Sequence, residues 1–537
     1  MDCDENPVAK PDRGVDAAKC QTDVRVEARS ENLRVVKGPA FFGPTSEIVT
    51  LVDSALCSVL VSPVGAPESF RETGVLMNRT IAVLVGAVLG AGCNGLELPT
   101  WRRRGPQAHG VEWRTSMKTR HTAALALALL IGCGPGIAAA DVVQDWNAHA
   151  LTATNAQNPF LQARSIAIVQ LAVFEAVNAV TGDYEPYLGT ISAPVGASVD
   201  AAAIEAAYRT LLGLGVAGSL GADYSAALAA ILDGQAKNDG IAVGLSAAQS
   251  MLANRTGDGA SPAVFFAPTS TDPGVWQPYA GCPVVNGLQV GILFHWQNLR
   301  PFGIDSSSQF RSAPPPQLQT GLYANDYKET MDVGELNSAA RPWDRADVAR
   351  YFAAAAAVHV WSQAASQVMT QNVTSISENA RIFALIAIAV SDGLVSSMET
   401  KYHYTVWRPI TAIRAGDTDG NDKTVPDPSW TPFIGTPCFP SYPSAHASAS
   451  YAARKIVEEL LGGSNHPITL SYPNTPVILS YTKFSEITDD IDDARVYAGI
   501  HFRFDQAAGA VQGRAVGLYV CQNNLRSISG ESGTCRE

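Results

Sequence analysis

The segment Phe439-Pro440-Ser441-Tyr442-Pro443-Ser444-Ala445-His446 leads into an alanine-rich run, Ala447–Leu461, which stops at Gly462-Gly463. Apolar residues in this run recur at helical spacing, so we expect a helix that begins near Ser444. Serine is a favoured N-cap residue, and the free N–H groups at a helix N-terminus attract anions. The segment therefore predicts an anion site with the imidazole of His446 beside it, although alone it would equally suit an ordinary cap with an exposed histidine.

Further alanine-rich segments with helical spacing fill much of the chain after residue 140, whereas strand-like alternation is scarce. They are Ala163–Val180, Val199–Leu212, Ser225–Leu232, Asp344–Val368, Ser377–Ser397 and Ala507–Val520. The Pro- and Gly-rich connections between them are long enough to be functional loops, and the longest are Thr269–Gly287, Pro301–Gln319 and Ala415–Tyr442. We therefore expect residues 141–537 to form one large all-α domain.

The composition excludes several classes of protein. The 537 residues are 46% hydrophobic and 16% charged, which is typical of a chain with a large buried core. The formal net charge is −12, so the excess of Lys and Arg that a general nucleic-acid or anionic-membrane binder needs is missing. Any anion site must therefore be local.

Residues 117–140, MKTRHTAALALALLIGCGPGIAAA, have the pattern of a secretory signal peptide. A basic start precedes a short apolar run, and the small residues Ala138 and Ala140 precede Asp141. The apolar run is shorter than the roughly 20 residues that span a membrane. Cleavage before Asp141 would therefore release a mature protein into the periplasm or the extracellular space, with no integral membrane association.

A signal peptide acts at an N-terminus, so we expect translation to start at Met117. Residues 1–116 would then be a non-native upstream extension or disordered. Two alternatives stay open: a real N-terminal region with an internal transmembrane helix, and a lipoprotein in which Cys133 is the lipidated first residue. We favour cleavage, because the Ala-x-Ala site is better placed.

Four cysteines remain after residue 140: Cys282, Cys438, Cys521 and Cys535. In an exported protein they allow up to two disulfides in three connectivities, which the sequence does not separate. We favour Cys521 with Cys535, which would close a C-terminal loop. No Cys/His spacing suggests a zinc site.

The segment Lys401-Tyr402-His403-Tyr404-Thr405-Val406-Trp407-Arg408-Pro409 carries two cations seven residues apart. Seven residues at about 100° each return to within about 20° of the starting direction. Lys401 and Arg408 would therefore project from one face of a helix that Pro409 helps to end. A solvated face is the commoner explanation of such a pair, but two cations could also face one site.

The segment Arg495-Val496-Tyr497-Ala498-Gly499-Ile500-His501-Phe502-Arg503-Phe504-Asp505 carries a second histidine. An unbroken helix would put Arg495 and His501 on different faces, so we expect a break near Gly499 that lets both reach one centre. Asp505 lies one turn beyond His501 if the helix resumes, and would orient its imidazole. A buried histidine with a nearby ion pair would give the same pattern.

Together the segments read Lys-x6-Arg-Pro, Pro-Ser-x-His and Arg-x5-His-x3-Asp, with residues 410–442 and 447–494 between them. This pattern resembles the signature shared by vanadium-dependent haloperoxidases and the type 2 phosphatidic acid phosphatase superfamily, which includes bacterial acid phosphatases. The resemblance covers most of residues 141–537. It implies a large helical bundle of the vanadium chloroperoxidase and acid phosphatase type, with the active site in residues 401–505.

The resemblance implies a site for a tetrahedral oxyanion, vanadate or phosphate, whose donors would be Lys401, Arg408, Ser444, Arg495 and the N–H of Ala445. In the haloperoxidases His501 would bind vanadium, His446 would act as acid and base, and Lys401 would polarise the bound peroxide. Halide would be oxidised to a hypohalous acid, which halogenates a small organic acceptor. In the phosphatases His501 would instead form a phosphohistidine, while His446 protonates the leaving alcohol.

Local residues favour the haloperoxidases. Phe439 falls where an aromatic residue or a histidine lines their halide pocket, and phenylalanine there is more similar to chloroperoxidases than to algal bromoperoxidases. Ala445 departs from the usual glycine and Met398 from the tryptophan of chloroperoxidases, so halide preference stays open. We expect a vanadate-dependent haloperoxidase that uses hydrogen peroxide; a secreted acid phosphatase and a non-catalytic oxyanion-binding protein are the alternatives.

Overall fold

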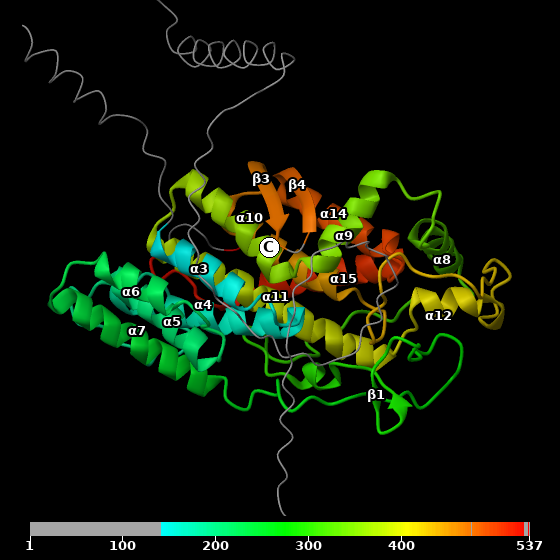
Figure 1. Cartoon of the computed structure of the whole chain (residues 1–537), viewed down its shortest axis with the longest axis horizontal. Coiled ribbons are helices and arrows are strands. Elements are labelled where there is room, and N and C mark those ends of the chain that lie inside the picture. Colours follow the sequence, from blue (N-terminus) through cyan, green and yellow to red (C-terminus); the bar gives the residue numbers. More distant parts are fainter. Residues whose placement is uncertain (1–140, 474, 531–534, 536–537) are drawn as a thin grey trace, which may run out of the picture. The chain divides into compact units, whose positions relative to one another are not determined.

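A computed structural model of the chain describes residues 141–473, 475–530 and 535 (Figure 1). The expectations for residues 1–116 and for the signal peptide at 117–140, with Cys133, lie outside these residues. The described part confirms the all-α class, because helices make up nearly all of its regular structure.

The helices of the described part are α3 (Val142–Ala153), α4 (Pro159–Thr181), α5 (Val199–Gly213), α6 (Gly221–Ala229), α7 (Gln235–Asn254), α8 (Gly321–Gly334), α9 (Trp343–Ala354), α10 (Ala357–Asn372), α11 (Ile376–Tyr404), α12 (Pro409–Arg414), α13 (Ala445–Leu461), α14 (Phe484–Tyr497) and α15 (Arg503–Asn523). Two short 3-10 helices accompany them, η3 (Phe294–Asn298) and η4 (Gly416–Thr418). The strands form two antiparallel pairs, β1 (Val284–Val285) with β2 (Leu288–Gln289) and β3 (Ser464–Tyr472) with β4 (Thr475–Lys483).

Helix α11 is the central element, and Figure 1 shows it passing through the middle of the bundle. It begins at a capping box formed by Ser375 and Glu378, and α4, α13 and α15 all pack against it. Helices α4 and α11 are both long and apolar enough to cross a membrane, but 89% and 100% of their most apolar windows are buried inside the protein. Burial in the core therefore accounts for their composition.

Helices α13 and α15 approach each other closely along three glycines of α15, Gly509, Gly513 and Gly517. A Cβ atom added at Gly509 would lie 2.6 Å from the carbonyl oxygen of Ser444, which is nearer than real Cβ atoms come. The missing side chain therefore permits the approach. It brings the first turn of α15 beside the start of α13, where the N–H of Ser444 donates to the carbonyl of Asp505 at 2.9 Å.

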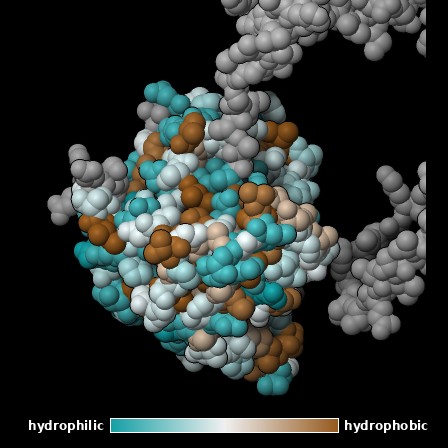
Figure 2. Space-filling model, turned by 90° about the vertical axis from the view of Figure 1, so that its left-hand side faces the viewer, coloured by the Kyte–Doolittle hydropathy of each residue, from teal (hydrophilic) through white to brown (hydrophobic). Residues whose placement is uncertain are grey.

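Helices α5, α6 and α7 form one end of the bundle, and α8 and α12 lie at the other end (Figure 1). Figure 2 shows the face at the α6 and α7 end, where hydrophobic residues lie in small groups among hydrophilic ones. Small, scattered groups of exposed apolar side chains are normal on a protein surface.

Three expectations from the sequence are wrong. The segment Asp344–Val368 forms two helices, α9 and α10, because Ala355 and Ala356 between them have extended backbone. Lys401 and Arg408 do not share a helix, because Thr405 takes a left-handed conformation (φ 49°) that ends α11. Pro409 begins α12 instead of ending a helix, as its fixed φ allows. In addition, the sequence analysis did not predict the β3–β4 hairpin.

Two disulfides join the four cysteines that follow residue 140. Cys521 pairs with Cys535, the connectivity that we favoured, and Cys282 pairs with Cys438. The second pair joins the loop before β1 to the residue that precedes Phe439. The N–H of Ile292 also donates to the carbonyl of Cys438 at 2.9 Å. Cys438 is therefore fixed both by the disulfide to Cys282 and by this hydrogen bond.

Candidate active site

The helix breaks between α14 and α15, as the sequence predicts for the neighbourhood of Gly499. Helix α14 ends at Tyr497, Gly499 has a φ of 75°, and α15 begins at Arg503. Side chains are excluded at Gly499 because a Cβ would collide with the backbone of Gly334. The break lets Arg495, near the end of α14, and His501, ahead of α15, reach the same cavity.

His501 is held between Asp505 and Arg408. Its Nδ1 lies 2.9 Å from Asp505 Oδ2, so Nδ1 carries the proton that the carboxylate accepts. Its Nε2 lies 3.0 Å from Arg408 Nη1, and arginine has only donors, so Nε2 is the acceptor. The lone pair of Nε2 is therefore directed away from Asp505 and accepts from Arg408, so a ligand on Nε2 would take the place of the Arg408 donor.

Asp505 is itself fixed by its surroundings. The hydroxyl of Ser441 donates to Oδ2 at 2.6 Å, and the N–H of Phe502 donates to the same oxygen at 3.0 Å. Burial raises the pKa of Asp505 to about 6, while the Ser441 hydrogen bond and the charge of Lys401 act in the opposite direction. Ser441 escaped the sequence analysis, although it lies inside the segment that we singled out.

Two buried guanidinium groups have donors that no described atom accepts. Arg408 Nη2 and Arg495 Nε are both buried without a partner, although Arg495 Nη1 reaches the carbonyl of Phe352 at 3.2 Å. Burial lowers the pKa of Arg408 to about 10, and burial with the nearby charge of Arg408 lowers that of Arg495 to about 9. Unpartnered buried donors cost free energy, and a bound anion that accepts from both arginines would remove this cost.

His446 lies in the first turn of α13. Ser444 is the N-cap, as predicted, because its hydroxyl accepts from the N–H of Ala447 at 3.4 Å. The N–H groups of Ala445 and His446 have no partner within the helix. Burial and the charges of Arg495 and Lys401 lower the pKa of His446 well below 6.5, so its ring is neutral at pH 7.

Lys401 is placed differently from our expectation. Its ammonium group donates to the carbonyls of Pro440, Ser441 and Pro443, with the first two at 3.1 and 2.7 Å. These bonds use its three protons, and Lys401 does not line the cavity. Its ammonium group fixes the loop 440–443, and its positive charge acts on the cavity from the far side of this loop.

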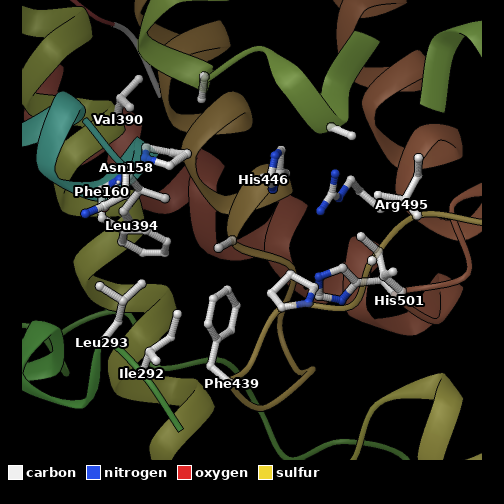
Figure 3. A pocket seen from close by; sticks show the side chains of 18 of the residues that line it. Asn158, Phe160, Ile292, Leu293, Val390, Leu394, Phe439, His446, Arg495 and His501 are labelled. Atoms are coloured by element: carbon white, nitrogen blue, oxygen red, sulfur yellow. Dashed lines mark hydrogen bonds between the residues drawn. The ribbon is translucent and has the colours of Figure 1, made fainter. Parts of the chain in front are cut away.

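The cavity of this site has a volume of about 330 Å³ and two chemically different ends (Figure 3). Figure 3 shows His446, Arg495 and His501 grouped at one end, and Phe160, Leu293, Val390 and Leu394 at the other. Phe439 lies between the two groups. Its ring also covers the buried cations, since Arg408 Cζ lies 4.9 Å and Lys401 Nζ 5.4 Å from the ring centroid.

Of the residues expected at the site, five line this one cavity: Phe439, Ala445, His446, Arg495 and His501. Arg408 and Asp505 contact His501 from behind, whereas the hydroxyl of Ser444 serves the helix cap. The apolar end was not foreseen, because its residues come from α4, α10, α11 and the loop 292–293 and carry no motif.

Residues 381–530 match the family model of the VCPO second helical-bundle domain, where VCPO stands for vanadium chloroperoxidase. The matched range contains every residue of the site that we predicted from the motifs. Over these residues, the chain is therefore similar to the second helical-bundle domain of vanadium chloroperoxidase.

Individual proteins are similar to this chain in sequence or in fold. The chain is 26% identical to the vanadium chloroperoxidase of Curvularia inaequalis over 176 residues, which are 24% of this chain and 28% of that protein. Its fold is similar to that of a bacterial vanadium-dependent iodoperoxidase (TM-score 0.61, 23% identity, 73% of this chain and 98% of the other). It is also similar to that of a bacterial vanadium-dependent chloroperoxidase (TM-score 0.55, 16% identity, 72% and 93%).

The haloperoxidase-like site fits a tetrahedral oxyanion. Among the described residues no group of three His, Cys, Asp or Glu side chains could hold a bare metal cation. The site offers instead the Nε2 atom of His501, which accepts from Arg408 in this structure, and unpartnered guanidinium donors on Arg408 and Arg495. This donor set suits an anion such as vanadate or phosphate, which needs several converging donors.

Proposed function

We propose that this protein is a vanadate-dependent haloperoxidase, which uses hydrogen peroxide to oxidise halide to a hypohalous acid. The observation that carries the proposal is the convergence of two cationic side chains with unpartnered donors and two neutral imidazoles on one buried site. The family of residues 381–530 supports the same activity.

The residues of the site divide the work between them. His501 Nε2 would bind vanadium, with Asp505 fixing the ring and its tautomer. Arg408 and Arg495 would hold the oxyanion, and the first-turn N–H groups of α13 would add donors. Bound vanadate would supply a Lewis-acidic centre that activates hydrogen peroxide. His446, neutral at pH 7, would accept and return the proton of the reacting oxygen.

Halide would bind beside Phe439. The ring excludes water, while the charges of Lys401 and Arg408 lie directly behind it and attract an anion. In this proposal Lys401 contributes long-range charge and the position of the loop, since its protons are held by carbonyl groups.

An acid phosphatase with a phosphohistidine intermediate is the second candidate. The His501–Asp505 pair favours it as well, because a nucleophilic imidazole needs the same tautomer and the same carboxylate partner. His446 would then protonate the leaving alcohol. The cavity would accept either oxyanion.

Two assays on one protein preparation separate these functions. We expect the protein to brominate a reporter dye with hydrogen peroxide and bromide only after addition of orthovanadate, and to hydrolyse an aryl phosphate slowly without it. Rapid phosphate hydrolysis with no bromination would favour the phosphatase. Absence of both activities, with oxyanion binding retained, would favour a binding protein.

We also propose that the protein is exported and starts at Asp141 after cleavage of residues 117–140. The two disulfides support export, because they form and persist in oxidising compartments. N-terminal sequencing of the protein from its native host tests this: a chain that starts upstream of Met117 would contradict it, and a lipidated Cys133 would favour the lipoprotein.

A further inference from the structure

We propose that the apolar end of the cavity binds a neutral, electron-rich aromatic molecule, such as a phenol or a naphthol, which is halogenated inside the cavity. The inference rests on the proposed haloperoxidase activity and names its organic acceptor. It predicts that the oxidised halogen is transferred within the cavity before it reaches solvent.

The position of the apolar end supports this role. Phe160, Leu394 and Val390 line the same 330 Å³ cavity as the imidazoles of His446 and His501 (Figure 3). A volume of this size lies at the lower end of the range for small-molecule sites, which are mostly apolar with a few polar groups. A molecule in the apolar end would therefore lie beside the place where halide is oxidised.

The shape of the apolar end favours an aromatic ring. The rings of Phe160 and Phe439 lie edge to face, with centroids 6.1 Å apart and planes at 81°. Phe160 makes a second edge-to-face contact with Trp296 at 5.9 Å. Phenylalanine rings fixed in this way offer both edges and faces to a further ring, which is the arrangement that aromatic pairs prefer.

The apolar end of the lining is also poor in side chains that react with the oxidant. Hypohalous acids attack sulfur groups fastest and also attack imidazole, amine, indole and phenol groups. The residues that line this cavity include no Met, Cys, Lys, Trp or Tyr, and its two histidines, His446 and His501, lie at the polar end. The side chains of Lys401, Met398 and Tyr402 are all buried nearby in α11, outside the lining. An electron-rich molecule in the apolar end would thus meet the halogen among unreactive side chains, with the two histidines at the other end of the cavity.

The chemistry balances with the substrates already proposed. Hydrogen peroxide, bromide and one proton give hypobromous acid and water, with bromide losing two electrons and peroxide gaining them. Hypobromous acid and the aromatic C–H then give the aryl bromide and a second water. No further oxidant or reductant is needed.

The first test is binding, which does not depend on activity. We use 2-naphthol as the probe and measure its affinity for the whole vanadate-free chain by calorimetry. Leu394→Trp and Ala357→Phe fill the apolar end from two different helices, and each should weaken binding at least tenfold. Leu228→Trp, on the partly exposed face of α6, is the matched control and should bind as the unmodified protein does. No binding to the unmodified protein, or unchanged affinity in both filled variants, would overturn the inference.

The second test is competition during turnover with vanadate, hydrogen peroxide and bromide. Free 2-naphthol competes with the same naphthol attached to a soluble polymer that is too large to enter the cavity. The measured quantity is the ratio of brominated free naphthol to brominated polymer-bound naphthol. The unmodified protein should give a ratio at least tenfold higher than hypobromite reagent gives, and Leu394→Trp should give the same ratio as the reagent. A reagent-like ratio for the unmodified protein would overturn halogenation inside the cavity. If bromide is not oxidised at all, the proposed function fails, and the binding test still decides whether the cavity takes an aromatic ligand.

Discussion

His501 and Asp505 face each other at the start of α15, with Nδ1 and Oδ2 2.9 Å apart. The same oxygen accepts from Ser441 and from the N–H of Phe502, so the carboxylate cannot turn without losing three hydrogen bonds. This arrangement fixes the direction of His501 Nε2, on which the proposed bond to vanadium depends.

Asp505→Asn should weaken vanadate binding by about 10- to 100-fold, because the amide no longer holds the imidazole in one tautomer and orientation. Equilibrium dialysis of vanadate measures this, with circular dichroism to show that the variant is folded. Asp223→Asn, in the first turn of α6 outside the site, is the control. An unchanged affinity in Asp505→Asn would show that the carboxylate does not position the ligand.

The two histidines should respond differently to substitution. His501→Ala should abolish stoichiometric vanadate retention, because it removes the proposed ligand atom. His446→Ala should keep measurable vanadate binding and lose most of the bromination rate, since only a proton transfer is lost. Binding and rate are measured on the same samples. Equal losses of vanadate affinity in both variants would refute this division of roles.

Gly509→Ala should destabilise the protein by about 1–3 kcal/mol, the usual cost of forcing an extra methyl group into a packed interface. The added Cβ would push against Ser444 and Ala447 at the start of α13. Gly321→Ala is the control, because a Cβ there meets nothing within 4 Å. Urea unfolding measures both. A Gly509→Ala variant as stable as the control would mean that α13 and α15 do not pack as described.

Acid should destabilise the vanadate-free protein through His446. The folded state holds its pKa well below the value of about 6.5 in an unfolded chain, so below that pH the unfolded state binds more protons. This contribution to stability is present above pH 6.5 and is lost as the pH falls. From pH 7.5 to 5.5 it amounts to about 1 kcal/mol.

His446→Gln isolates this contribution. Buried carboxyl groups such as Asp392 and Asp505, whose pKa values burial raises to about 6, act in the opposite direction in both proteins. The free energy of unfolding should therefore fall less between pH 7.5 and 5.5 in His446→Gln than in the unmodified protein. The same change in both proteins would contradict the lowered pKa of His446.

The parts of the site that the sequence predicted are those that local rules govern. A serine before an alanine-rich run predicted the cap at Ser444, and the spacing of Arg495 and His501 predicted the break at Gly499. The orientation of Lys401 depends on the loop 440–443, which folds back onto α11 from 39 to 42 positions away in the chain. The same is true of the apolar end, where Phe160 and Leu394 meet only because α4 packs against α11. Such long-range contacts have no signature in local spacing.

For the fold as well, local spacing did not reveal every element: it missed the β3–β4 hairpin and the break between α9 and α10. Residues 344–368 keep helical spacing through the break, so the pattern alone does not reveal the extended backbone at Ala355 and Ala356. Segments whose helical pattern is uninterrupted, such as Ser377–Ser397 within α11, were predicted well.

The most direct test of the proposed function is a titration of the vanadate-free protein with orthovanadate, followed by the rate of peroxide-dependent bromination at each point. We predict that the rate rises to a plateau at one vanadate per chain, and that inorganic phosphate shifts the curve to higher vanadate because both oxyanions use Arg408 and Arg495. No bromination at any vanadate concentration, in a protein that hydrolyses an aryl phosphate rapidly without vanadate, would contradict it.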